Sequence, residues 1–221
     1  MITRDLDELR TYENIIGCDE VGRGPLAGPV SACAVRFEKS NLALLEKLQS
    51  LSITDSKKLS AKKRQNILAE LKIDVSKIIL DQKYENSSLG QSFTFCVSEH
   101  DHKDIDQLNI LQASLSAMKK ASDSIKNNSS KILIDGNKVF DSTVETESIV
   151  KGDSQVLAIA MASIIAKEYR DKKMKEFDIL YPGYNLGKHS GYPTKEHRDA
   201  IKKLGPSKIH RKTFKGVKEF C

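Results

Sequence analysis

Two carboxylates and a glycine-rich loop meet in the stretch GCDEVGRGPLAGPV, residues 17–30. Asp19 and Glu20 follow a short apolar run, a pattern that predicts a strand ending in acids. The Gly22-Arg23-Gly24 loop comes next, where glycines admit unusual backbone angles and an arginine offers a planar cation suited to phosphate. Because carboxylates repel phosphate, acids beside such a loop indicate an intervening divalent cation and metal-dependent phosphodiester chemistry.

Bulk composition places this stretch in a modest-sized, basic chain. The 221 residues suffice for one domain with an appendage, and 36 Lys and Arg against 30 acids give a net charge of +6, which suits a polyanionic partner. The four cysteines, at 18, 33, 96 and 221, have no metal or redox spacing, which indicates a reducing compartment. Without a signal-peptide pattern or an apolar run of about 18 residues, we expect a cytoplasmic protein with no membrane segment.

Strand-like and helix-like segments alternate, which predicts an α/β fold with one central sheet. Strands are expected at 14–19, 28–37, 77–83, 131–135 and 144–150, and 93–97 is either an edge strand or the lead-in to a helix. Helices are expected at 2–12, 41–49, 61–71, 103–125, 154–176 and 194–204.

Asp135 and Asp153 share the setting of Asp19 and Glu20, since each lies at the end of an expected strand or the start of a helix. Each also has a simpler interpretation, because Asp135-Gly136 is a common turn dipeptide and Asp153 could merely cap a helix. Four carboxylates in one cleft cannot all ionise without a counter-charge. Together they indicate a site for hard divalent cations, of which Mg²⁺ suits phosphate substrates best.

Further blocks complete a pattern that runs from about residue 15 to 214. They are DSKKLS at 55–60, IDG at 134–136, KGD at 151–153, ASIIAK at 162–167 and GYPT at 191–194 with His197. In this order the blocks resemble the signature of type 2 ribonuclease H. The resemblance implies a ribonuclease H-like mixed five-stranded sheet flanked by helices in residues 1–180, and a helical substrate-binding extension in residues 181–221.

The resemblance also implies an activity. The expected enzyme is an endonuclease that hydrolyses the RNA strand of RNA–DNA hybrids and cuts 5′ of single ribonucleotides in duplex DNA, as in ribonucleotide excision repair. Asp19, Glu20, Asp135 and Asp153 would be catalytic and would bind two Mg²⁺ or Mn²⁺ ions, leaving 5′-phosphate and 3′-hydroxyl ends. Asp19 would bridge both ions, and the partition of the other ligands stays open.

Substrate-reading residues follow from the same resemblance. The backbone of Gly22, Arg23 and Gly24 would contact the 2′-hydroxyl that distinguishes RNA from DNA, although a tight turn explains these residues equally simply. Tyr192 would stack on the next sugar, or else anchor the last helix.

Phosphate contacts are expected from a second stretch. Ser56, Lys57 and Lys58 look like phosphate contacts, and a solvated lysine pair is the alternative. A basic track could continue through Lys167, Arg170, Lys188, His210, Arg211 and Lys212, each of which could also be ordinary surface.

Two alternative functions are type 3 ribonuclease H and a nucleic-acid-binding module without catalysis. Type 3 ribonuclease H shares much of this pattern but carries an extra N-terminal domain and a glutamate as fourth acid, whereas here the signature begins at residue 17 and the fourth acid is Asp153. A nucleic-acid-binding module without catalysis would not need all four acids. Residues 216–221 lack the glutamine-plus-aromatic motif that tethers some relatives to a sliding clamp, so no tether is expected, and the protein is expected to be a monomer.

Overall fold

A six-stranded mixed sheet forms the centre of the computed structural model, which describes residues 2–51, 53–88 and 90–221. The strands are β1 (Asn14–Val21), β2 (Val30–Glu38), β3 (Lys83–Ser88), β4 (Gln91–His100), β5 (Ser130–Asp135) and β6 (Thr146–Ile149). Their order across the sheet is β3-β4-β2-β1-β5-β6, with β1 antiparallel to β2 and parallel to β5. The α/β class is therefore confirmed, with six strands in place of the expected five.

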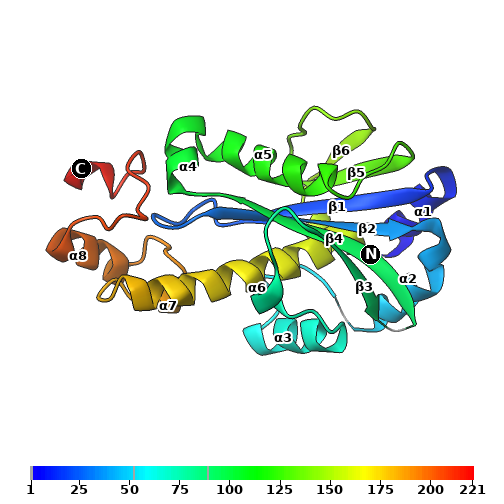
Figure 1. The fold of residues 1–221 in the computed structure, drawn as a ribbon, viewed down its shortest axis with the longest axis horizontal. Coiled ribbons are helices and arrows are strands. Elements are labelled where there is room, and N and C mark those ends of the chain that lie inside the picture. Colours follow the sequence, from blue (N-terminus) through cyan, green and yellow to red (C-terminus); the bar gives the residue numbers. More distant parts are fainter. Residues whose placement is uncertain (1, 52, 89) are drawn as a thin grey trace.

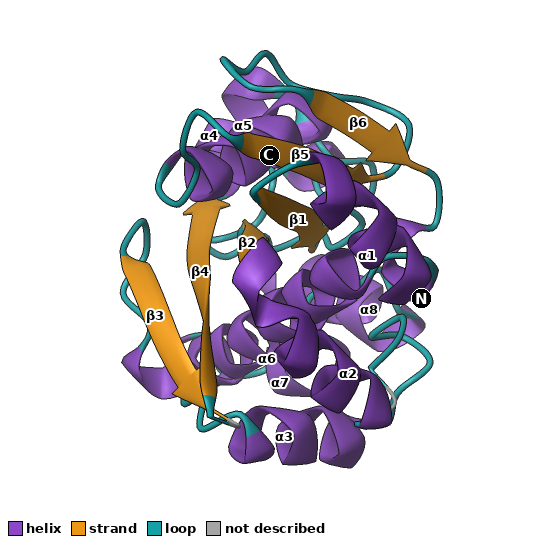
Figure 2. Cartoon of the chain, turned by 90° about the vertical axis from the view of Figure 1, so that its right-hand side faces the viewer, coloured by secondary structure: helices purple, strands orange, loops and turns teal. Residues whose placement is uncertain are grey.

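Helices cover both faces of this sheet (Figures 1 and 2). They are α1 (Ile2–Thr11), α2 (Leu42–Ser50), α3 (Ala61–Glu70), α4 (His102–Leu108), α5 (Ile110–Asp123), α6 (Leu157–Leu180), α7 (Leu186–His189) and α8 (Lys195–Leu204). Short 3₁₀ turns occupy Lys39–Asn41, Val75–Lys77, Gly152–Ser154 and Lys218–Phe220. Figure 1 shows α4 and α5 along one face and α6 with α2 and α3 along the other. Among the described helices, none combines the length and the apolar character that a membrane crossing requires.

Strand β1 is buried on both faces, because helices cover both sides of the sheet. Ile15 points into the core under α6, and Ile16 and Cys18 point into the core under α5. Gly17 lies directly beneath α6, where an added Cβ would come within 2.3 Å of the Ala158 backbone. The missing side chain thus lets α6 lie close to the strand that ends in Asp19 and Glu20.

The N-terminus of α6 is capped from outside the helix. Val156, the N-cap residue, offers no capping side chain. Asp5 of α1 instead accepts hydrogen bonds from the backbone N–H groups of Leu157 (2.8 Å) and Ala158 (3.0 Å). Helix α1 therefore completes the helix end that leads away from Asp153.

Three expected elements were wrong in detail. Residues 93–97, expected as an edge strand or the lead-in to a helix, belong to the internal strand β4, which pairs with both β3 and β2. Residues 77–83 were expected to be a strand, but residues 78–82 connect a 3₁₀ turn to β3, and the edge strand is the polar segment β3. Its polarity fits an edge position, since only β4 pairs with it. The long helix expected at 103–125 is broken at Asn109, which has a φ of 67° and whose side chain caps α5.

Residues 181–221 form the expected helical C-terminal region, at one end of the molecule (Figure 1). The region has its own small core, to which Leu26, Ala27 and Met174 of the preceding chain contribute. Backbone hydrogen bonds from Leu26 to Gly191 (2.8 Å) and from Gly28 to Ile209 (2.9 Å) join it to the loop that follows β1. The C-terminal region and the glycine-rich loop are thus packed as one unit.

Candidate active site

The sheet brings the four predicted acids to one edge. Asp19 and Glu20 lie near the end of β1, and Asp135 is the last residue of the parallel neighbour β5. The register pairs Cys18 with Ile134, so Asp19 and Asp135 follow side by side. Asp153 lies in the 3₁₀ turn immediately before α6. Carboxyl ends of adjacent parallel strands are a common place for ligand sites in α/β folds.

The pKa values of the two β1 acids, Asp19 and Glu20, are both raised. Burial, with Glu20 and Asp135 nearby, raises the pKa of Asp19 well above its ordinary value, while a hydrogen bond from Ser163 opposes this. Burial also raises the pKa of Glu20 to about 7, although Arg23, 3.5 Å away, favours the charged form. These acids therefore share a field in which negative charge is disfavoured until a cation offsets it.

Asp153 lies close to a fifth carboxyl group, that of Asp55, which was not predicted as a site residue. Burial, Asp135 and Asp55 together raise the pKa of Asp153 to about 6, and Lys57 opposes the shift. Asp55 also accepts a hydrogen bond from the backbone N–H of Lys57 (2.9 Å), so it helps to fix the conformation of residues 55–58. Burial lowers the pKa of Lys57, but the surrounding carboxylates outweigh this and raise it overall. Asp55 is the first residue of the DSKKLS block, and this position was the one sequence feature that could have identified it as a site residue.

Divalent cations fit this donor set by its chemistry. The oxygen-rich, mutually repelling carboxylates are the ligands that Mg²⁺ and Mn²⁺ prefer. Within residues 2–51, 53–88 and 90–221, no three His, Cys, Asp or Glu side chains already form a closed ligand set. Two of the acids accept one backbone hydrogen bond each. The Glu20 N–H donates to one oxygen of Asp19 (2.7 Å), and the Gly152 N–H donates to one oxygen of Asp135 (2.7 Å).

The glycine-rich loop and Tyr192 lie against each other. A Cβ added at Gly24 would lie 3.4 Å from the Tyr192 ring, an ordinary van der Waals distance, so the loop backbone faces the tyrosine across a gap about one methyl group wide. The Tyr192 ring remains partly open to solvent. Gly22 has a φ of 99°, which favours glycine, and its Cβ would collide with Arg170 at 2.2 Å. The glycine-rich loop and Tyr192, both predicted to bind substrate, are thus neighbours.

The expected phosphate contacts divide into two kinds. Ser56 is buried, and its hydroxyl is hydrogen bonded to that of Ser163 at 2.8 Å. Since Ser163 also bonds Asp19, Ser56 lies behind the acid rather than on the surface. Lys57 and Lys58 are exposed beside it. Ser163 was not predicted as a site residue, although it belongs to the ASIIAK block.

Three residues assigned to the possible basic track, Arg170, His210 and Arg211, are buried and do not lie on the surface. Arg170 and Arg211 are completely buried, with 0% of each exposed. Their guanidinium groups donate to backbone carbonyls of the glycine-rich loop, from Gly22 to Pro29. The planar five-donor fork of arginine explains why such a loop recruits it. They are internal supports of the loop, not surface phosphate contacts.

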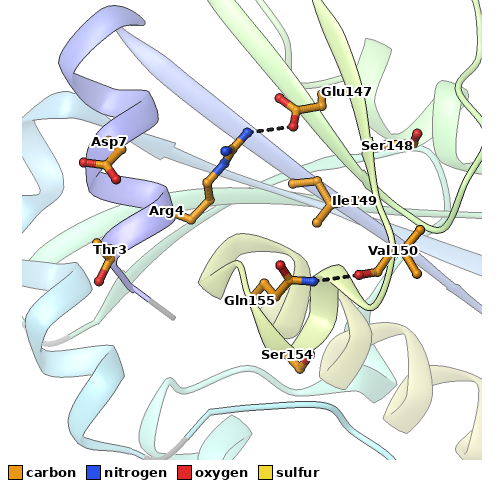
Figure 3. A pocket seen from close by; sticks show the side chains of 9 residues that line it. All are labelled: Thr3, Arg4, Asp7, Glu147, Ser148, Ile149, Val150, Ser154 and Gln155. Carbon is orange, nitrogen blue, oxygen red and sulfur yellow. Dashed lines mark hydrogen bonds and ion pairs between the residues drawn. The ribbon is translucent and has the colours of Figure 1, made fainter.

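A polar cavity of about 660 Å³ lies elsewhere, between α1 and β6 (Figure 3). Arg4 and Glu147 form an ion pair across it at 2.7 Å, and Gln155 donates to the carbonyl of Val150 at 2.6 Å. Because its groups bond one another and none of the four acids lines it, this cavity is separate from the acid-lined edge.

The fold and the acid-lined edge define a nuclease of the ribonuclease H class. A family model described as Ribonuclease HII matches residues 16–217. The chain therefore belongs to the ribonuclease HII family. It is a ribonuclease H, an endonuclease acting on RNA–DNA hybrids, which decides against a type 3 enzyme and against a binding module without catalysis.

Individual relatives agree with this membership. Ribonuclease HII from Francisella tularensis subsp. mediasiatica (strain FSC147) is 40% identical over 92% of this chain and 96% of its own. Among solved structures, ribonuclease H2 from Pyrococcus horikoshii OT3 has a TM-score of 0.67 at 23% identity, over 94% of this chain and 96% of its own. Bst-RNase HIII in complex with Mn²⁺ has a TM-score of 0.61 at 16% identity, over 97% of this chain and 71% of its own. At these identities the structures support the fold alone.

Proposed function

We propose that this enzyme cuts on the 5′ side of a ribonucleotide embedded in duplex DNA, in addition to cutting RNA–DNA hybrids. The position of Gly24 opposite the Tyr192 ring carries this proposal. In this arrangement a backbone that would hydrogen bond a 2′-hydroxyl lies near an aromatic ring that would stack on the following deoxysugar. One ribonucleotide followed by DNA would satisfy both features at once.

Asp19, Glu20, Asp135 and Asp153 would hold the divalent cations, Mg²⁺ or Mn²⁺. When bound, two such cations would offset the carboxylate charge and stabilise the attacking and leaving oxygens of an in-line displacement. Ser163 would keep Asp19 oriented through its hydrogen bond. Lys57, close enough to Asp19 and Asp153 to respond to their charge, would receive the neighbouring phosphate.

Charge distribution supports a substrate-binding role for residues 181–221. This region has 10 Lys and Arg against 3 acids, a net charge of +7, so residues 1–180 carry −1 of the total of +6. Only Arg211 among these cations is fully buried. We therefore propose that the chain divides into a catalytic domain, 1–180, and a polyanion-binding extension, 181–221.

Product ends test the proposed reaction. Attack by water leaves a 5′-phosphate on the ribonucleotide and a free 3′-hydroxyl upstream, whereas attack by the 2′-hydroxyl would leave a 2′,3′-cyclic phosphate. Wild-type enzyme should give the former ends in Mg²⁺ or Mn²⁺ and little product in Ca²⁺. A cyclic phosphate product would refute the proposed chemistry.

A further inference from the structure

Arg170 and Arg211 enclose the glycine-rich loop from two sides. Arg170 comes from α6 and Arg211 from the segment after α8. Arg211 donates to the carbonyls of Gly22 (2.6 Å) and Arg23 (3.0 Å) at the start of the loop. It also donates to the carbonyls of Gly28 and Pro29, at the end of the loop. One guanidinium thus closes the loop at both ends.

Arg170 supports the far side of the same loop and bonds the segment that carries Tyr192. It donates to the carbonyls of Pro29 (2.9 Å) and Ala27 (3.2 Å), and to that of Ser190 (3.0 Å). Ser190 lies two residues before Tyr192. Arg170 therefore sets the position of the loop relative to the ring that lies beside Gly24.

These two arginines differ from the chain's other buried arginine. Arg64 also donates to loop carbonyls, but it is ion-paired with Glu168 at 2.6 Å. Among the described residues, no carboxylate forms an ion pair with Arg170 or Arg211. A buried cation without a carboxylate is costly to keep, unless carbonyl dipoles are held firmly toward it.

The carbonyl directions determine where the neighbouring N–H groups point. In a trans peptide unit the C=O and the following N–H point in opposite directions, and the described chain has no cis peptide. Because the carbonyls of Gly22 and Arg23 face Arg211, the N–H groups of Arg23 and Gly24 face away from it. Neither N–H bonds another described residue. Two adjacent free donors thus lie on the side of the loop away from the buried guanidinium.

We propose that Arg211, assisted by Arg170, is a specificity-determining positioning residue that turns the N–H groups of Arg23 and Gly24 toward the ribose 2′-oxygen. The inference rests on the proposed function, because it assumes that this loop reads the 2′-hydroxyl. Lysine keeps the charge but cannot bridge four carbonyls with one nitrogen, so Arg211→Lys should release the loop. Contacts to phosphates outside the loop should be unaffected.

The test compares the dissociation constants, in Ca²⁺, of two duplexes that differ by one 2′-hydroxyl: DNA with a single ribonucleotide, and all-DNA of the same sequence. Wild type should prefer the first. Arg211→Lys should reduce this preference by about tenfold, the worth of one or two hydrogen bonds, while all-DNA affinity stays the same. Arg36→Lys is the matched control, since Arg36 also bonds a carbonyl, that of Ile125, but at the far end of β2.

The outcomes separate three cases. An unchanged preference in folded Arg211→Lys would overturn the inference, as would an equal loss of affinity for both duplexes. A wild type with no preference at all would overturn the proposed function first. If Arg211→Lys does not fold, hydrogen exchange of wild type decides: the Arg23 and Gly24 amides should be protected by the ribonucleotide duplex and not by all-DNA, and equal protection would overturn the inference.

Discussion

At the scale of single residues, we propose that the four acids carry the chemistry. Asp19→Asn or Asp153→Asn keeps the side-chain shape but removes a charged ligand, and turnover in Mg²⁺ should fall at least about a hundredfold because several kcal/mol of charge stabilisation are lost. Circular dichroism should show an intact fold. Asp141→Asn, an exposed acid that lies beside α5, is the control. Near-normal turnover of either site variant would refute the assignment of these residues.

The exposed lysines of the 56–58 loop should act through phosphate. Replacing Lys57 and Lys58 by alanine should lower the slope of log affinity against log salt by up to about 2, one unit per lost contact. Lys119 and Lys120, an adjacent pair on α5, provide the control double variant. An unchanged slope would place Lys57 and Lys58 away from the bound strand.

The positions of individual residues could be predicted where the neighbouring sequence indicated the end of a strand or the start of a helix. Asp19 with Glu20, Asp135 and Asp153 are gathered at one sheet edge, as their strand-end positions indicated. The buried roles of Arg170 and Arg211 were not predictable, because an arginine in a charged stretch gives no sign that backbone carbonyls will surround it. The burial of Ser56 was not predictable for a related reason, since its partner Ser163 is 107 positions away.

At the scale of elements, α1 should stabilise α6 through a single side chain. Asp5→Ala leaves the N–H groups of Leu157 and Ala158 buried without a partner, which should lower the free energy of unfolding by about 1–3 kcal/mol. Urea denaturation measures this. Asp5→Asn, which retains an acceptor oxygen, should lose less. Equal stability of Asp5→Ala and wild type would show that the cap contributes nothing.

Element boundaries were less predictable than element types. The apolar run at 156–166 identified the long helix α6, but α6 continues to Leu180 through a charged stretch that packs against the C-terminal region. β3 has no apolar alternation, and only its pairing with β4 makes it a strand. Asn109 interrupts a continuous helical pattern, because its side chain caps α5. The length of α6 and the pairing of β3 depend on tertiary partners, which local periodicity does not contain, whereas the break at Asn109 is a local cap inside a continuous apolar pattern.

At the scale of the whole molecule, a histidine cluster joins α8 to the last segment. His197 Nδ1 donates to the carbonyl of Tyr192 (3.0 Å), so its Nε2 accepts from His210 Nε2 (3.1 Å). His210 Nδ1 in turn accepts the N–H of Ser207, and the His189 ring stacks on His197. This arrangement needs neutral rings, and burial lowers the pKa of both His197 and His210 to about 4.

Acid should therefore weaken this region. In the unfolded chain these histidines bind protons near pH 6.5, whereas the folded chain resists protonation to about pH 4, so stability is retained above pH 6.5 and lost as the pH falls to 4. The loss should reach several kcal/mol. Buried acids such as Asp5 act in the opposite direction, so the measurement is the difference between wild type and His210→Gln in urea at each pH. A difference that does not vary with pH would contradict the neutral network.

The central claim is that the glycine-rich loop and Tyr192 together read one ribonucleotide followed by DNA. Mapping the cut in a DNA duplex that contains a single ribonucleotide tests it most directly, with a duplex containing four consecutive ribonucleotides beside it. The wild-type enzyme should cut both, and in the first the cut should fall on the 5′ side of the lone ribonucleotide. An enzyme that cuts only the run of four would contradict the claim, while leaving the acid-lined site in place.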